Sequence, residues 1–343
     1  MGGSSSAFSR LGRSATTTGG YGRSNPVSRR GNPIASLVSP PDSSIMSPAF
    51  EFLSSLASSP TVSQLQPDDE GQVIGDRYVL GQLLGHGGFS IVREAVVLDP
   101  RQHTTQSFAV KIVRKDVGDE RNNDCVQDHL QQEVALWRRL NHPHILRQLE
   151  VVNAPHATYI VSELCARGTL LQHITQHGTP GLTEADARPL FVQLAQALQY
   201  LHQRAGVAHH DLKLDNVLLD QDYHVKLADF GLSRPLLTPC HHAGGSLAYC
   251  SPEQARTSYP LCAASSDMWS LGVILYALVI GTLPFMDDYE PRLVMAILNR
   301  RLKKPYDHLS PALQELLDCL LCVDPSRRWN IDQVLQSEWC RSA

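Results

Sequence analysis

Five short motifs with chemically useful side chains occur in one order along the sequence. A glycine-rich segment, GHGGFSIV, begins at Gly85 and is followed by FAVK, HHDLKLDN, DFG and finally SPE, which ends at Glu253. Glycines let backbone amides approach a phosphate, and the later motifs supply the lysines and acidic side chains that phosphoryl transfer uses. Each motif alone occurs by chance, but their order and approximate spacing are hard to obtain by accident. The series therefore predicts phosphoryl-transfer chemistry.

The sequence around these motifs predicts a small β-rich region followed by a larger helical one. The segments RYVLGQLLG, SIVREAVVL, SFAVKIV and YIVSEL have the apolar and β-branched composition of strands. Residues 128–140 predict a helix before the last of these strands. After Arg167 the pattern is mostly helical, and EADARPLFVQLAQALQYLHQ is the clearest amphipathic segment. No period of about 20 to 50 residues recurs, which argues against solenoids and propellers.

Together, the motifs and the order of the elements resemble the eukaryotic protein kinase family over about Tyr78–Trp339. The resemblance implies an α+β, two-lobed kinase fold over residues 76–343, with a β-rich N-lobe over about 76–164 and a mainly helical C-lobe over about 165–343. It also implies transfer of the γ-phosphoryl of ATP to protein hydroxyls, with Mg²⁺. The run DMWSLGVILYALVIGTLPF and the DPSRRW ending look most like the calcium/calmodulin-dependent and AMP-activated kinase group.

The resemblance assigns residues to an ATP site. Lys111 would contact the α- and β-phosphates, and Glu133 on the following helix would hold Lys111 in an ion pair. Ser162 falls at the gatekeeper position, the residue that closes the back of the adenine pocket. A small gatekeeper should admit bulky ATP-competitive inhibitors. The nucleotide-binding residues implied are Gly85, Gly87, Gly88, Val92, Ala109, Lys111, Glu133, Glu163, Cys165 and Leu218.

The resemblance also assigns the reacting groups. Asp211 matches the base that accepts the substrate hydroxyl proton, and Lys213 would neutralise the transferring phosphoryl. Asn216 and Asp229 would hold magnesium, since a hard cation takes oxygen ligands. Lys213 two residues after the base is the serine/threonine-kinase form of this loop. Ser246 supports the same choice, because it keeps a hydroxyl where such kinases usually have threonine.

Three further positions match structural features of the family. Glu253 is expected to pair with Arg328 in DPSRRW, and Asp267 is expected to hold the backbone of the catalytic loop. Phe230 of DFG would pack against the helix that carries Glu133. These residues would support the site without taking part in the reaction.

Two positions depart from the family pattern. Ser90 replaces the third glycine of the glycine-rich loop, and His210 stands where most of the family has an arginine. That arginine normally pairs with a phosphate on the activation segment, whereas histidine is only partly charged near neutral pH. Phosphorylation of that segment is therefore expected to matter less. Both departures motivate a rival interpretation, a pseudokinase that serves as a docking or scaffold module.

Residues 1–75 are rich in Ser, Gly, Pro and Thr, and the sequence predicts a disordered tail. The first 41 residues contain five arginines and no acidic residue. Organelle transit peptides and plain basic tails share this bias, and the absence of a clean amphipathic helix favours the plain tail. Regulators that act on the tail would be one class of partner.

Composition restricts the remaining partners. The 343 residues carry a formal net charge of −4 without a Lys/Arg-rich block, which gives no drive toward nucleic acid. The apolar run from Leu271 is shorter than the roughly 20 residues needed to span a bilayer and predicts a buried helix. Eight cysteines scattered through a long chain with no secretory signal favour reduced thiols. Cytoplasm or nucleus is the compartment expected for such a chain. The resemblance to protein kinases implies protein substrates, and we expect a monomer.

Overall fold

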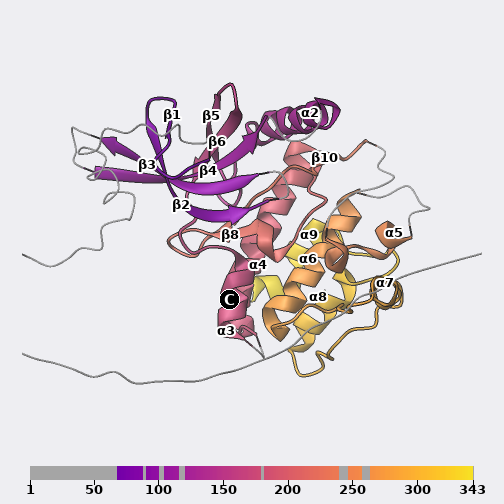
Figure 1. The fold of residues 1–343 in the computed structure, drawn as a ribbon. Coiled ribbons are helices and arrows are strands. Elements are labelled where there is room, and N and C mark those ends of the chain that lie inside the picture. Colours follow the sequence, from indigo (N-terminus) through magenta and orange to yellow (C-terminus); the bar gives the residue numbers. More distant parts are fainter. Residues whose placement is uncertain are drawn as a thin grey trace, which may run out of the picture. The chain divides into compact units, whose positions relative to one another are not determined.

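The structure is a computed structural model, and it describes residues 68–87, 90–99, 104–115, 120–178, 181–238, 246–256 and 263–342. Most of the predicted tail and Gly88 lie outside the described residues. The described residues contain a sheet-rich part and a helix-rich part, in that order along the chain (Figure 1). This is the α+β, two-lobed arrangement that the sequence predicts.

The N-lobe is built on a six-stranded antiparallel sheet with the strand order β1-β2-β3-β4-β6-β5. Helix α2 (Glu120–Trp137) lies beside this sheet (Figure 1). The helix begins earlier than the predicted residue 128, because its first turns are polar and show no apolar periodicity. The strands are β1 (Val73–Ile74), β2 (Tyr78–His86), β3 (Ile91–Asp99), β4 (Thr104–Arg114), β5 (Gln148–Asn153) and β6 (Ala157–Glu163).

Strand β4 contributes to two different environments. Val110 and Ile112 are buried in an apolar cluster that also contains Ile74 and Tyr78. Lys111 lies between them in sequence, and side chains alternate along a strand, so Lys111 points to the opposite face of the sheet. One face of β4 thus packs in this cluster, and the other carries Lys111 together with the buried Val113.

The N-lobe sheet begins before the boundary expected at residue 76. Strand β1 pairs with β2, and Ile74 is only 3% exposed, so the sheet includes residues that were assigned to the tail. A two-residue strand within polar sequence has no periodicity that could reveal it.

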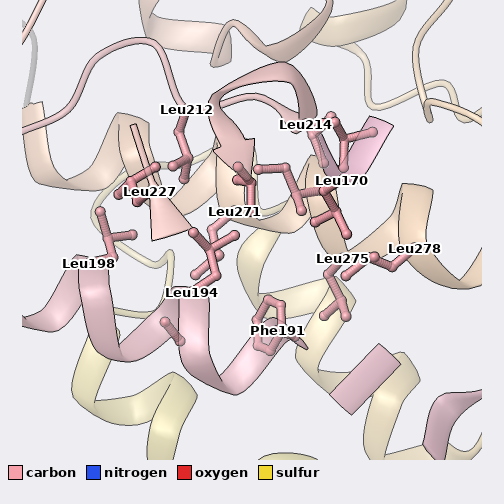
Figure 2. Packing of buried hydrophobic residues seen from close by; sticks show 14 of the residues in the cluster. Leu170, Phe191, Leu194, Leu198, Leu212, Leu214, Leu227, Leu271, Leu275 and Leu278 are labelled. Carbon is pink, nitrogen blue, oxygen red and sulfur yellow. The ribbon is translucent and has the colours of Figure 1, made fainter. Parts of the chain in front are cut away.

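The C-lobe packs its helices around one large apolar core (Figure 2). Two small antiparallel pairs lie beside the helices, formed by β7 (Val207–Ala208) with β10 (Arg234–Pro235) and by β8 (Val217–Leu219) with β9 (Val225–Leu227). The helices are α3 (Leu170–His177), α4 (Glu184–Gln199), α5 (Pro252–Ala255), α6 (Ala263–Ile280), α7 (Glu290–Leu298), α8 (Pro311–Leu320), α9 (Ile331–Gln336) and α10 (Glu338–Arg341).

Helices α4 and α6 form the centre of this core. The side chain of Thr183 caps the start of α4, and Leu190, Leu194 and Leu198 recur at four-residue spacing on its buried face. Helix α6 contains the apolar run from Leu271 and is buried, as predicted. In the part of the chain that the structure describes, no helix has the length and apolar character required to cross a bilayer.

The expected ion pair between Glu253 and Arg328 is confirmed. Arg328 donates from Nη1 to Oε1 of Glu253 at 2.7 Å and from Nη2 to Oε2 at 2.9 Å, and its side chain is fully buried. Burial alone would raise the pKa of Glu253, but the hydrogen bonds and charge of Arg328 lower it. The buried carboxylate therefore stays ionised and fastens α5 to the segment before α9.

We expect Arg328→Ala to lower the free energy of unfolding by about 3–5 kcal/mol, because it leaves the Glu253 charge buried without its partner. Urea denaturation of the variant and the parent protein measures this loss. Arg327→Ala is the matched control, since the neighbouring Arg327 is exposed. Equal losses in the two variants would contradict the assignment.

Candidate functional site

Lys111, Glu133 and Asp229 form one charged cluster between the lobes. The Nζ of Lys111 lies 2.6 Å from Oε1 of Glu133 and 3.7 Å from Oδ1 of Asp229. Burial lowers the pKa of Lys111, but the two carboxylates raise it and set the net direction. The lysine therefore stays cationic, and the predicted ion pair with Glu133 is formed.

The DFG segment is held by packing and by charge. Burial opposes ionisation of Asp229, yet Lys111 and then His209 lower the pKa of this half-exposed carboxyl. Phe230 is fully buried and packs against Trp137, with ring centroids 6.3 Å apart. Trp137 is the last residue of α2, so Phe230 contacts the helix that carries Glu133, as expected.

Trp137 also joins α2 to the sheet. Its indole Nε1 donates a hydrogen bond of 2.6 Å to the backbone carbonyl of Leu146, in the segment just before β5. Because Trp137 is four residues after Glu133, both side chains lie on one face of the helix. The helix is therefore fixed on the face that presents Glu133 to Lys111.

The catalytic loop gathers around the carboxylate of Asp211. Lys213 Nζ donates to Oδ2 at 2.6 Å, and Asn216 Nδ2 donates to the same oxygen at 3.1 Å and to the Asp211 carbonyl at 2.8 Å. Oδ1 accepts the backbone N–H of Ser246 at 3.3 Å. The described contact of Ser246 with the predicted base is thus made by its backbone.

Asp267 in α6 holds this loop from below, as predicted. Its Oδ2 accepts the backbone N–H of His209 at 2.8 Å, and its Oδ1 accepts that of His210 at 2.9 Å. Nε2 of His202 lies 2.8 Å from Oδ2 of Asp267; His202 is part of the π-helical turn Tyr200–Ala205, which continues α4. Burial would raise the pKa of Asp267, but the hydrogen bond and charge of His202 lower it. A buried carboxylate thus fixes two consecutive peptide units beside Asp211.

The glycine-rich loop connects β2 and β3. Gly85 is opposite Val92 in the sheet register, and Val92 is in turn opposite Lys111. The Gly87 amide donates to the carbonyl of Ser90 at 2.7 Å, so these two residues close the turn. The register therefore aligns Gly85 with Lys111 across the sheet, with Val92 on the strand between them.

The remaining predicted nucleotide residues come from both lobes. Ala109 in β4 is opposite Ser162 in β6, and the Ser162 side chain is almost completely buried. Cys165 and Leu218 are half-buried, and both pack against the C-lobe core. Burial, with a further contribution from Glu163, raises the pKa of Cys165 to about 12, so the thiol is protonated.

The side chain of Glu163 makes two contacts that the sequence does not predict. Lys226 in β9 lies 2.8 Å from Oε2 of Glu163, and the backbone N–H of Arg147 donates to Oε1 at 2.7 Å. These three residues also line a cavity of about 220 Å³ that reaches the Leu140–Ile145 segment. Neither partner belongs to a recognisable motif, and only the pairing of the strands brings them to Glu163.

A sequence description of the protein kinase domain matches residues 78–340 of this chain, most of its length. The chain belongs to the protein kinase family. It is 37% identical over 268 residues to an SNF1-related protein kinase catalytic subunit, alpha KIN12, of Arabidopsis thaliana, covering 76% of this chain and 51% of that protein.

Two animal relatives are similar at the same level. A hormonally up-regulated neu tumor-associated kinase homolog of Xenopus tropicalis is 35% identical over 305 residues, covering 85% of this chain and 41% of that protein. Serine/threonine-protein kinase SIK2 of Gallus gallus is 35% identical over 272 residues, covering 77% of this chain and 32% of that protein. The chain spans about half or less of the length of these relatives. The SNF1-related and SIK2 matches confirm the predicted kinase group.

His210 is a buried residue of the catalytic loop, directly before Asp211. The residue is 7% exposed and has a positive φ of 66°, and neither ring nitrogen has a hydrogen-bond partner among the described residues. Burial lowers the pKa of His210 and outweighs the opposing charge of Asp267, while His209, Arg234 and His202 lower the pKa further. The imidazole therefore carries less positive charge at pH 7 than an exposed histidine, in the direction that the contrast with arginine predicts.

Because the folded pKa of His210 lies below its value of about 6.5 in the unfolded chain, the unfolded chain binds more protons below that pH. Neutral His210 therefore costs no free energy of unfolding above about pH 6.5. As the pH drops from there toward the folded pKa, the unfolded chain takes up the proton first and the free energy of unfolding falls. We expect His210→Gln to flatten the fall in unfolding free energy between about pH 7 and pH 5.

Urea unfolding at several pH values in this window measures the effect, and His129→Gln is the control because His129 is exposed on α2. Parallel pH profiles for the parent protein and His210→Gln would contradict a protonation cost at His210.

Proposed function

We propose that this chain is an active, magnesium-dependent protein serine/threonine kinase that transfers the γ-phosphoryl of ATP to protein hydroxyls. The observation that carries the proposal is the closed pair between Lys111 and Glu133, with Asp229 beside it. This pair is one of the arrangements that phosphoryl transfer requires in protein kinases. The serine/threonine kinases among the relatives support the same reaction.

The protein kinase family generally uses ATP and Mg²⁺, and the residues present fit both. Asn216 uses its amide nitrogen on Asp211, which leaves its oxygen to bind a cation, and the Asp229 carboxylate is ionised. Hard cations take such oxygen ligands. Lys111 remains cationic, and an added Cβ at Gly85 would meet no atom within 4 Å, so the backbone there has open space beside it. Mg²⁺ when bound neutralises charge on the phosphates.

Asp211 is the proposed base that orients the attacking hydroxyl and accepts its proton. Its two oxygens are fixed by different groups, Oδ2 by Lys213 and Asn216 and Oδ1 by the Ser246 backbone. Fixed geometry contributes to rate because the attacking hydroxyl does not have to search for its base. Lys213, within reach of the same carboxylate, would stabilise the charge of the transferring phosphoryl.

Two features support serine and threonine as acceptors. Lys213 follows the base in the serine/threonine form, and Ser246 lies beside Asp211. Asp215 is an exposed residue of the loop that carries Asp211, and it offers a negative charge to a substrate with a basic residue near its acceptor.

We further propose that the chain acts as a monomer in the cytoplasm or nucleus, and that regulators act through its N-terminal tail.

The pseudokinase alternative has little support. The carbonyl of Ser90 accepts the Gly87 amide in a closed turn, and His210 is buried with its backbone N–H held by Asp267. Neither departure removes a group that the proposed reaction needs.

We expect the purified chain to transfer γ-phosphate from ATP to Ser/Thr peptides in a mixed library with magnesium, and not to tyrosine peptides. Asp211→Asn should lower kcat by a factor of about 10²–10⁴, since it removes the proposed base. Radiolabel transfer measures both rates. Transfer that persists in Asp211→Asn, or a parent protein that binds ATP without transfer, would contradict the proposal.

The gatekeeper gives a separate prediction. Ser162 is buried opposite Ala109, and replacing it with methionine should fill the space behind the adenine position. We expect Ser162→Met to lose sensitivity to bulky ATP-competitive inhibitors by at least about tenfold, while its KM for ATP stays near that of the parent. Inhibition curves with a bulky and a small ATP-competitive inhibitor test this. Equal shifts for both inhibitors would argue against Ser162 as the gatekeeper.

A further inference from the structure

The segment 68–74 lies ahead of the residues that match the kinase family, yet it makes specific contacts with the sheet. Asp68 is 8% exposed, and its carboxylate forms an ion pair with Arg114, the last residue of β4. Its backbone carbonyl accepts a hydrogen bond of 2.6 Å from Nε of Arg93 in β3. Nη1 of Arg93 in turn donates to the Gly81 carbonyl in β2 at 2.9 Å. Asp68 is thus connected to three strands.

The rest of the segment is held by backbone pairing and by burial. The Gly71 amide donates to the Leu80 carbonyl at 2.8 Å, and the Leu80 amide donates to the Gln72 carbonyl at 2.9 Å. Ile74 is buried in the cluster that contains Ile112 of β4. The segment therefore contributes Ile74 to the apolar cluster on the face of β4 opposite Lys111.

The end of β4 is also connected to α2. The carbonyl of Arg114 accepts a hydrogen bond of 3.4 Å from Gln127 of α2. The next residue, Lys115, is held from the other side, because its Nζ donates to the Ala154 carbonyl at 2.8 Å and its amide to the His156 carbonyl at 3.0 Å. The point where the chain leaves β4 for α2 is therefore fixed by Asp68 and by the β5–β6 turn together.

We propose that Asp68 is a positioning residue for the kinase reaction, acting through Arg114 on the ion pair between Lys111 and Glu133. Lys111 is three residues before Arg114 on β4, and Glu133 is six residues after Gln127 on α2. Without the carboxylate of Asp68, the Arg114 side chain loses its partner and the end of β4 gains freedom. The pair that binds the ATP phosphates then opens more often. This inference rests on the proposed function.

Kinetics with the full chain distinguish this role from simple stabilisation. We expect Asp68→Asn to lower kcat/KM for ATP by about 3- to 30-fold at a temperature where every variant is folded. Glu70→Gln is the matched control, because it removes an exposed carboxylate from the same segment. It should stay within about twofold of the parent protein. Thermal unfolding is recorded for each variant in parallel.

A double-mutant cycle tests the route through Arg114. Arg114→Gln should reproduce the loss seen in Asp68→Asn, and the double variant should be no worse than either single variant. Asp68→Glu, which keeps the charge, should recover part of the activity. If Asp68→Asn does not fold, the Arg114→Lys variant is measured in its place. Lysine keeps the positive charge but lacks the planar guanidinium group of arginine.

The outcomes separate the two proposals. Variants that lose thermal stability but keep the parent kcat/KM would overturn the positioning role, and additive losses in the double variant would overturn the route through Arg114. A parent protein with no phosphoryl transfer would instead count against the proposed kinase activity.

Discussion

The pairing of Lys111 with Glu133 is the interaction on which the other features of the site depend. A lysine on a partly buried face of a sheet needs an anion, and the anion comes from a different element, α2. The pair therefore forms only when α2 packs correctly. Trp137 fixes that packing, because its ring contacts Phe230 and its indole N–H binds the Leu146 carbonyl. One charge interaction thus requires the sheet, the helix and the DFG segment to be assembled together.

In the C-lobe, the irregular loop around Asp211 is held in place by a buried carboxylate. The loop around Asp211 has little regular secondary structure to satisfy its backbone groups, and the carboxylate of Asp267 takes that role for two successive amides. Asp267 belongs to α6, the most deeply buried helix of the lobe. The apolar core fixes the position of α6, and α6 in turn fixes the backbone of the catalytic loop (Figure 2).

Most of the fold and of the site could be predicted, because the motifs carry their own spacing and the strands and long helices have clear periodicity. The contacts of Asp68, Arg147 and Lys226 could not, since single charged residues outside motifs look like surface charge until the strands pair. The burial of His210 could not be predicted either, because sequence does not report burial at a loop residue. Local sequence patterns predict strands and helices. Ion pairs between residues far apart in the sequence form only when the strands have paired.

The salt bridge between Glu163 and Lys226 has a consequence for movement between the lobes. Lys226 lies in β9, three residues before Asp229, so Glu163 at the end of β6 is joined to the hairpin of β8 and β9 that leads into the DFG segment. A movement of the sheet over the helices therefore has to carry the β8–β9 hairpin along with Glu163 or break the bridge between Glu163 and Lys226.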